Sequence, residues 1–268
     1  MCQERSISKI CLSFDDGRLD NYLFVWPTLK RLHLPATFNI CTGYVLGINS
    51  LETFTKVKPM TPEMVREIYA DKSMEIASHG HMHQSTASDI LLGVNHLLEM
   101  VGAEKLYGGL NGLAVPYNRI SQLEWSQLQS ILAEKNICYV RKSVRYQTHA
   151  EWRILCRKIS RLLPIPRLYL WAHEHTLMGQ DTVEDFVYSV PVLATTPPRC
   201  VVSLINLAVR DRKNLVLQFH SVGDVSYNES FTYPIKSFNS IVSHLKLAQD
   251  EGVLNVVTTM GMVRNHLK

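Results

Sequence analysis

The chain lacks any long hydrophobic run: nowhere in its 268 residues do 18 consecutive apolar residues occur. A helix that crosses a bilayer needs about 20 such residues, so the sequence predicts no transmembrane segment. The first six residues also lack the apolar core of a secretory signal peptide and lead directly into a predicted strand. Read literally, these absences predict a protein that is not exported, and we expect it to be cytoplasmic.

The chain also lacks a large net charge and a cysteine pattern typical of a disulfide framework. The net charge is only +4, and the short basic concentrations at 153–161 and 210–213 favour a solvated surface, so we expect no nucleic-acid partner. The six cysteines include no Cys-x-x-Cys pair, and four of them have apolar neighbours, which favours buried thiols. No internal repeat of about 20–50 residues is visible. The length and the ordinary hydrophobic content of 46% predict one domain spanning residues 1–268.

What the chain does have is a regular alternation of apolar strands and amphipathic helices. The pattern predicts strands at 9–14, 36–41, 74–78, 112–116, 137–140, 214–220 and 254–258, and helices at 21–32, 62–71, 88–103, 121–135, 195–210 and 234–249. Thr61-Pro62-Glu63 is typical of a helix start, with an N-cap, a proline in the first turn and an early acid. Such alternation predicts a parallel sheet and an α/β architecture.

One segment, 148–191, departs from this rhythm, and we interpret it as an insertion over one face of the main domain. It contains a basic helix-like stretch and the sequence Trp-Ala-His-Glu-His at 171–175. This second histidine-rich group could form a metal or acid site or an aromatic wall for a sugar ring. The alternative interpretation is that this sequence has no functional role and consists of a packed Trp171 beside surface histidines at 173 and 175.

The strongest chemical signal is Ser-Phe-Asp-Asp-Gly at 13–17, where an apolar strand ends in two adjacent carboxylates. Two carboxylates this close repel each other, so one tends to stay ionised while the other takes up a proton, unless a nearby cation offsets the repulsion. Ser-His-Gly-His-Met-His at 78–83 offers the matching cation ligands. If the chain turned helical there, His79 and His83 would share one face and His81 would point away, whereas pairing of His79 with His81 would need an extended backbone. One Asp with two His leaves coordination positions open, as in a catalytic zinc site.

These motifs, together with an apolar strand that ends in His220, resemble the carbohydrate esterase family 4 polysaccharide deacetylases, the NodB-homology domain. The resemblance runs from about residue 9 to residue 257 and omits the insertion. It implies a distorted (β/α) barrel of about seven parallel strands with the catalytic groups at the carboxyl ends of the strands. By motif position it implies that Asp15 is the general base and that Asp16, His79 and His83 bind a divalent ion. That ion is most often zinc, with Co²⁺, Ni²⁺ or Mn²⁺ as alternatives.

The resemblance extends to three further catalytic candidates. The Pro-Tyr at 116–117 matches the motif whose backbone N–H helps to hold the tetrahedral oxyanion, and His220 matches the general acid that protonates the leaving amine. The chain departs from the pattern at Ala114, where many members carry an arginine that pairs with the base. We hypothesise that Arg141, at the end of the strand 137–140, supplies that guanidinium instead.

The resemblance thus implies a metal-dependent carbohydrate N-deacetylase that removes an N-acetyl group from a GlcNAc-containing glycan or glycan precursor. The residues by themselves support metal-assisted hydrolysis of an amide or ester. One alternative is a deacylase of a small or lipid-linked sugar, or another C–N hydrolase of the same superfamily. The other is a carbohydrate-binding pseudoenzyme. The oligomeric state is not predicted.

Overall fold

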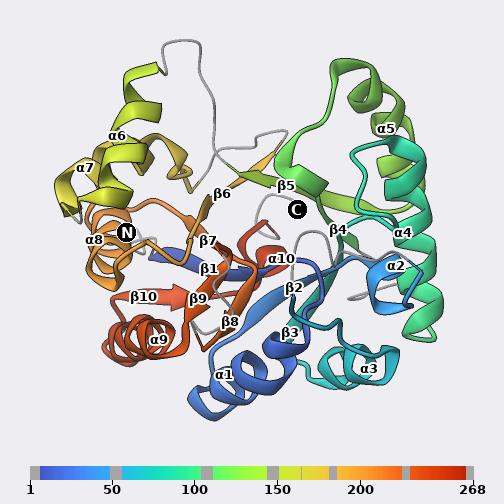
Figure 1. Ribbon diagram of the computed structural model, residues 1–268, viewed down its shortest axis with the longest axis horizontal. Helices are drawn as coiled ribbons and strands as arrows, with labels where there is room; N and C mark the ends of the chain where they lie inside the picture. The colour runs from blue at the N-terminus through green and yellow to red at the C-terminus, as the bar shows by residue number, and fades with distance from the viewer. Residues whose placement is uncertain are drawn as a thin grey trace, which may run out of the picture.

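The computed structural model describes residues 7–48, 56–103, 111–143, 151–163, 165–180, 186–224 and 230–263. Within these ranges, seven parallel strands form a sheet that closes on itself through the pairing of its first and last members (Figure 1). The strands are β1 (Ser8–Phe14), β2 (Ala36–Ile40), β3 (Met74–Ser78), β4 (Asn111–Ala114), β5 (Ile137–Ser143), β6 (Val187–Pro191) and β7 (Leu215–Phe219). The predicted distorted (β/α) barrel is confirmed.

The distortion lies along β1. Ile10 is paired with both Leu215 of β7 and Val256 of β10 (Leu254–Val256), so β7 and β10 lie on opposite edges of β1. Ser13 is paired with Thr37 of β2 on the same edge that β10 uses lower down. The strand β10 therefore fills the gap where β1 and β2 diverge at their amino ends.

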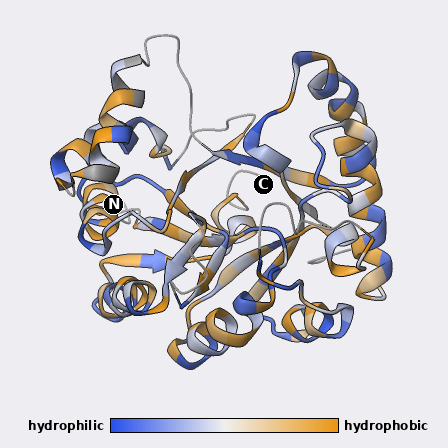
Figure 2. Ribbon diagram, viewed as in Figure 1, coloured by the Kyte–Doolittle hydropathy of each residue, from blue (hydrophilic) through white to orange (hydrophobic). Residues whose placement is uncertain are grey.

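Helices cover the outside of the barrel (Figures 1 and 2). They are α1 (Trp26–Leu32), which continues the π-helical turn η1 (Asn21–Val25), α2 (Thr42–Val45), α3 (Pro62–Ala70), α4 (Ala87–Met100), α5 (Gln122–Glu134), α6 (Glu151–Leu162), α7 (Pro166–His173), α8 (Pro198–Arg210) and α9 (Ile235–Asp250). The short helix α10 (Thr259–Val263) instead packs against the amino end of the barrel interior. The predicted start of α3 is confirmed, because the Thr61 side chain accepts a hydrogen bond from the Met64 N–H.

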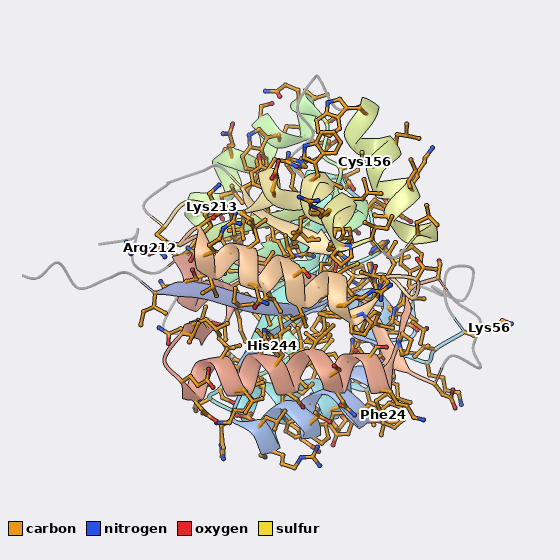
Figure 3. The ribbon with its side chains drawn as sticks, turned by 90° about the vertical axis from the view of Figure 1, so that its left-hand side faces the viewer. Phe24, Lys56, Cys156, Arg212, Lys213 and His244 are labelled. Atoms are coloured by element: carbon orange, nitrogen blue, oxygen red, sulfur yellow. The ribbon has the colours of Figure 1, made fainter. Side chains whose placement is uncertain are left out.

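Alternation along the strands separates an apolar outer layer from a polar interior. Phe14 stacks on Phe38 and Phe219 of the neighbouring strands, with ring centroids 5.3 and 5.4 Å apart, and meets Phe238 of α9 edge-on. The helices α8 and α9 run side by side over this layer (Figure 3). Side chains one position away from the phenylalanines point into the barrel, which is how buried polar groups reach its centre.

The interior at the amino ends of the strands is closed by a buried carboxyl group. Glu75 of β3 accepts hydrogen bonds from the hydroxyls of Thr37 (2.9 Å) and Tyr139 (2.6 Å) and from the Met260 N–H of α10 (2.9 Å). Burial raises its pKa despite these donors. The functional candidates all lie at the other end of the barrel.

The range 148–191 holds more regular structure than its description as an insertion suggests. Its described part forms α6, α7, the 3₁₀ turn η4 (Glu174–Thr176) and β6, while residues 148–150, 164 and 181–185 lie outside the described ranges. Because β6 pairs with β5 and β7, the last five residues of the range are a barrel strand. The sequence pattern missed β6 because the strand is short and follows a long irregular stretch.

Candidate active site

A cavity of about 430 Å³ opens at the carboxyl ends of the strands. Side chains from the ends of β1, β3, β6 and β7, the turn η3 (Pro116–Asn118) and the loop before β9 (Thr232–Pro234) surround it. The lining residues are Asp15, Asp16, Arg18, His79, His83, Tyr117, Asn118, Pro191, Leu193, Gln218, His220, Ser230 and Phe231. Six of the seven predicted site residues are in this lining, and the seventh, Arg141, lies beneath it against Asp15.

Three of the lining residues form a cluster suited to a metal ion: Asp16, His79 and His83. The Nε2 atoms of the two histidines are 3.3 Å apart, and they lie 3.4 and 3.5 Å from Oδ1 of Asp16. Ligand atoms about 2.0–2.1 Å from a tetrahedral zinc ion would be about 3.3–3.4 Å from one another. The cluster therefore fits a zinc-sized ion without rearrangement.

The tautomer of His79 is fixed by the backbone. Its Nδ1 lies 2.9 Å from the carbonyl oxygen of Ala114, and because a carbonyl can only accept, Nδ1 must carry the proton. The lone pair is then on Nε2, the atom that faces Asp16 and His83. Ala114, where the family pattern often has arginine, thus takes part through its main chain.

The two histidines converge through a loop and not through the helical turn considered from the sequence. Residues 79–86 are not helical, and the buried carboxylate of Asp89 in α4 gathers them by accepting hydrogen bonds from the N–H groups of residues 81, 82 and 84. Gly80 allows α4 to approach closely, because a Cβ there would lie 2.6 Å from Oδ2 of Asp89. His81 does point away, with its Nδ1 close to Thr42 and His96.

Arg18 holds the other oxygen of Asp16. Its Nε and Nη2 both lie 2.8 Å from Oδ2, and its Nη1 donates to Ser221 at 2.9 Å. Burial raises the pKa of Asp16, but the Arg18 guanidinium outweighs burial and holds that pKa well below its usual range. Asp16 is therefore ionised, with Oδ1 directed at the two histidines.

Asp15 is fully buried and receives a separate set of partners. Nη2 of Arg141 lies 2.7 and 2.8 Å from its two oxygens, Asn39 donates to Oδ1 at 2.8 Å and Gln218 donates to Oδ2 at 2.7 Å. Burial raises the pKa of Asp15, but Arg141, first among the nearby cations, brings it below the ordinary value. Arg141 itself is completely buried and donates to Ser189 of β6 at 2.8 Å. Arg141 and Asp15 thus form a buried ion pair in the barrel interior.

His220 and Tyr117 lie on the cavity wall. Burial lowers the pKa of His220, and no described residue pairs with its Nδ1. The ring of Tyr117 packs edge-on against His83, with centroids 4.5 Å apart, while half of its surface stays exposed.

Several of these residues have an uncommon backbone. Asp16, His83 and Tyr117 adopt φ values of 79°, 57° and 53°, the left-handed region that costs a non-glycine residue of order 1–3 kcal/mol. Strained residues of this kind persist only where the contacts around them hold the backbone in place, and they are concentrated at functional sites.

The sequence reasoning missed Asn39, Gln218, Arg18 and Asp89. Gln218 could have been noticed as the single polar residue of β7, and Asn39 as one of two polar residues in β2. The histidine-rich group at 171–175 is not part of this site, since none of Trp171, His173 and His175 is in the cavity lining.

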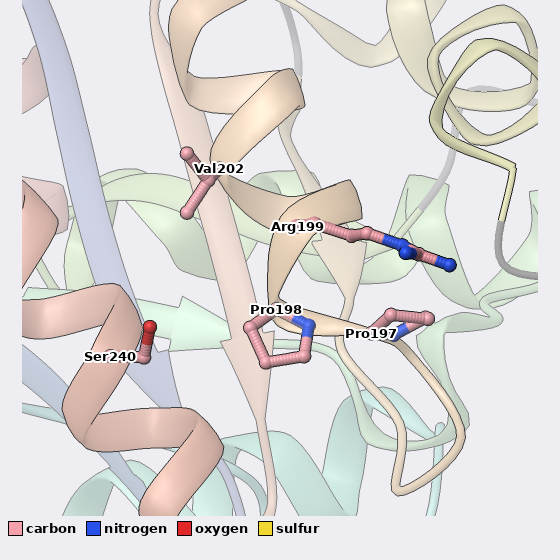
Figure 4. Close-up of a pocket in the computed structure, with 5 residues that line it drawn as sticks. All are labelled: Pro197, Pro198, Arg199, Val202 and Ser240. Carbon is pink, nitrogen blue, oxygen red and sulfur yellow. The ribbon is translucent and has the colours of Figure 1, made fainter.

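A second hollow, of about 510 Å³, lies between the start of α8 and α9 (Figure 4). Its lining of Pro197, Pro198, Arg199, Val202 and Ser240 includes one ionisable side chain. That side chain is Arg199, and none of the residues predicted for the site lines this hollow.

The closed parallel barrel with this cluster at its carboxyl strand ends places the chain among the distorted (β/α) barrels that carry a candidate metal site. Residues 3–98 match the sequence model of the polysaccharide deacetylase family. The resemblance inferred from the motifs is thereby confirmed for the segment that carries Asp15, Asp16, His79 and His83. No curated protein matches the chain.

Solved structures give more distant likenesses. The Xyl-CE4 domain of a multidomain xylanase from the hindgut metagenome of Trinervitermes trinervoides is 15% identical, with a TM-score of 0.49, over 97% of this chain and 91% of that one. The polysaccharide deacetylase Bc1974 from Bacillus cereus is 12% identical, with a TM-score of 0.49, over 94% and 91%. The Streptococcus pyogenes deacetylase PplD, solved with acetate, is 19% identical, with a TM-score of 0.39, over 48% of this chain and 54% of that one. This chain thus spans about half of PplD, and these likenesses carry no argument about activity.

Among the described residues, no helix is both long enough and apolar enough to cross a bilayer.

Proposed function

We propose that the chain is a metal-dependent hydrolase that removes the N-acetyl group of an amino sugar, and that residues 1–268 form one catalytic domain. The observation that carries the proposal is the pairing of two differently held carboxylates in one cavity. Asp16 faces His79 and His83, whereas Asp15 is bound by Arg141. A metal-assisted amide hydrolysis needs this division, with one set of ligands and one separate acid–base group.

Asp16, His79 and His83 would hold the ion, with zinc as the expected metal. When bound, the ion would polarise the amide carbonyl and acidify a water molecule. The His79–Ala114 hydrogen bond holds the ring proton on Nδ1, so Nε2 is the nitrogen available to the ion, and Arg18 restricts Asp16 to one ligating oxygen.

Asp15 would accept the proton of the attacking water. An ionised carboxylate has about four lone-pair sites, and Arg141, Asn39 and Gln218 donate at all four. One donor must therefore yield before Asp15 can take a proton. Gln218 is the donor that also lines the cavity, so we assign the proton to Oδ2, the oxygen that Gln218 covers.

His220 would donate a proton to the leaving nitrogen. Burial lowers its pKa, which makes its protonated form a stronger acid. The backbone N–H of Tyr117 would face the developing oxyanion. The exposed rings of Tyr117 and Phe231 border the cavity and offer apolar faces for a sugar ring.

Acetate release from short GlcNAc oligomers, measured on metal-free protein and again after Zn²⁺ is added, tests this function. We expect activity only with metal, and its loss in Asp16→Asn. The matched control is Asp250→Asn, which changes an exposed aspartate at the end of α9. Activity on N-acetylglucosamine itself but not on its oligomers would indicate the small-substrate alternative. If no metal bound and no acetylated sugar released acetate, the enzyme interpretation would be wrong.

A further inference from the structure

The helices α6 and α7 carry a concentration of exposed apolar side chains. Five large residues on these helices and the turn between them are between 37% and 56% exposed: Trp152, Leu155, Leu163, Ile165 and Trp171. We call them the α6–α7 surface. Scattered single apolar residues are normal on a protein surface, but a group of five within 20 residues of sequence is not scattered.

Three of these residues form a stripe along one face of the first helix, α6. Trp152, Leu155 and Leu163 recur at helical spacing, next to the side of α6 that buries Cys156 and Ser160. The rings of Trp152 and Trp171 are in contact, with centroids 3.8 Å apart, and so join α6 to α7. In turn α7 packs on α8, so the pair is anchored to the barrel on one side and presents this stripe on another.

The same segment carries all the excess positive charge of the chain. Residues 151–173 contain five basic residues and one acidic residue, a net charge of +4, and the rest of the chain contains 23 of each. The basic side chains of Lys158 on α6 and Arg167 on α7 are exposed. A basic surface with protruding Trp, Leu and Ile side chains has the composition of helices that lie in the interface of an anionic bilayer.

We propose that the α6–α7 surface docks the protein on an anionic lipid membrane. Pairing with a second copy of the chain would place +4 against +4, and nucleic acid would not use the exposed aliphatic side chains. The docking does not depend on the proposed chemistry, but it would bring the cavity close to the membrane, because the docking helices are connected to strands of the site. The α6–α7 pair connects β5, which carries Arg141, to β6, whose Pro191 lines the cavity.

Sedimentation with vesicles tests the proposal on the full-length chain. We expect binding to phosphatidylcholine vesicles that contain about a quarter phosphatidylglycerol, and this binding should weaken as salt rises above about 0.1 M. Binding to pure phosphatidylcholine should be weak and should not fall with salt. The Lys158→Gln/Arg167→Gln pair should lower the partition coefficient roughly 20–30-fold, about fivefold for each residue. Leu155→Ser/Leu163→Ser should lower it about tenfold or more.

Matched controls come from other helices. Leu123→Ser/Leu247→Ser removes leucines that are even more exposed, on α5 and α9, and should leave vesicle binding unchanged. All of these variants change exposed residues, and circular dichroism checks that they fold. The proposal is overturned if the wild type does not bind anionic vesicles, if it binds neutral vesicles equally well, or if the α6–α7 variants bind like the controls. Binding to RNA or to a soluble acidic glycan with no binding to vesicles would also overturn it.

Discussion

Replacing Arg141 by Met removes the main partner of a buried carboxylate. Arg141 is completely buried, Asp15 is 1% exposed, and the two are joined by contacts of 2.7 and 2.8 Å. Methionine fills much of the same volume without a charge. The substitution therefore leaves an ionised Asp15 in the barrel interior with only Asn39 and Gln218 as donors.

The expected loss of stability follows from this geometry. Breaking a buried ion pair by removing one partner costs about 3–5 kcal/mol, and the two remaining amide donors place the loss near the lower end of that range. The arginine keeps the pKa of Asp15 below its ordinary value, so the stabilisation is present at neutral pH and is lost as the pH falls through that pKa. In the variant the pKa rises. The difference in unfolding free energy between wild type and variant should therefore be largest at neutral pH and shrink in acid.

Urea unfolding at intervals from pH 7 down to about pH 3 measures the loss of unfolding free energy and its dependence on pH. The matched variant is Arg141→Met with Asp15→Asn, which removes the buried charge as well and should recover part of the loss in a double-mutant cycle. Arg141→Lys keeps the charge but not the planar group that binds Ser189 and Asp15 together. A loss below about 1 kcal/mol, or one with no dependence on pH, would refute the reasoning.

Activity offers a second test of the same residue. If Asp15 is the base and Arg141 keeps it ionised, the acid limb of the pH–rate profile should move to higher pH in Arg141→Met. An unchanged rate and profile would show that the pair is structural only.

Three other substitutions have definite expected outcomes. His83→Ala should abolish stoichiometric zinc binding in equilibrium dialysis while the fold is retained, and full zinc content would contradict the assigned ligand set. His220→Ala should lower kcat about 10²–10⁴-fold with the metal retained, and near-normal turnover would refute a role as the acid. Burial raises the pKa of Asp20 to about 7, so the wild type should lose stability as the pH rises from about 4 to 7. Asp20→Asn should therefore stabilise the protein at pH 8 by up to about 4 kcal/mol and very little near pH 4, and an equal effect at both pH values would exclude this account.

Much of the fold could be predicted from the local pattern. The apolar run that forms β1, the helix start at Thr61-Pro62 and the motif Ser-Phe-Asp-Asp-Gly at 13–17 are local signals, because periodicity and capping depend on neighbouring residues. The strand β6 could not be predicted, since its five residues are held by pairing with β5 and β7 and not by any local preference.

The sequence by itself determined the candidates for the site: two adjacent carboxylates, a set of histidines, and Arg141 as a substitute for the arginine missing at Ala114. Only the tertiary structure decided how they combine. Asp89 folds the histidine loop so that His79 pairs with His83, and closure of the barrel brings Arg141 to Asp15 across 126 positions of sequence. Such contacts depend on where strands lie around the barrel, and no spacing along the chain encodes that position.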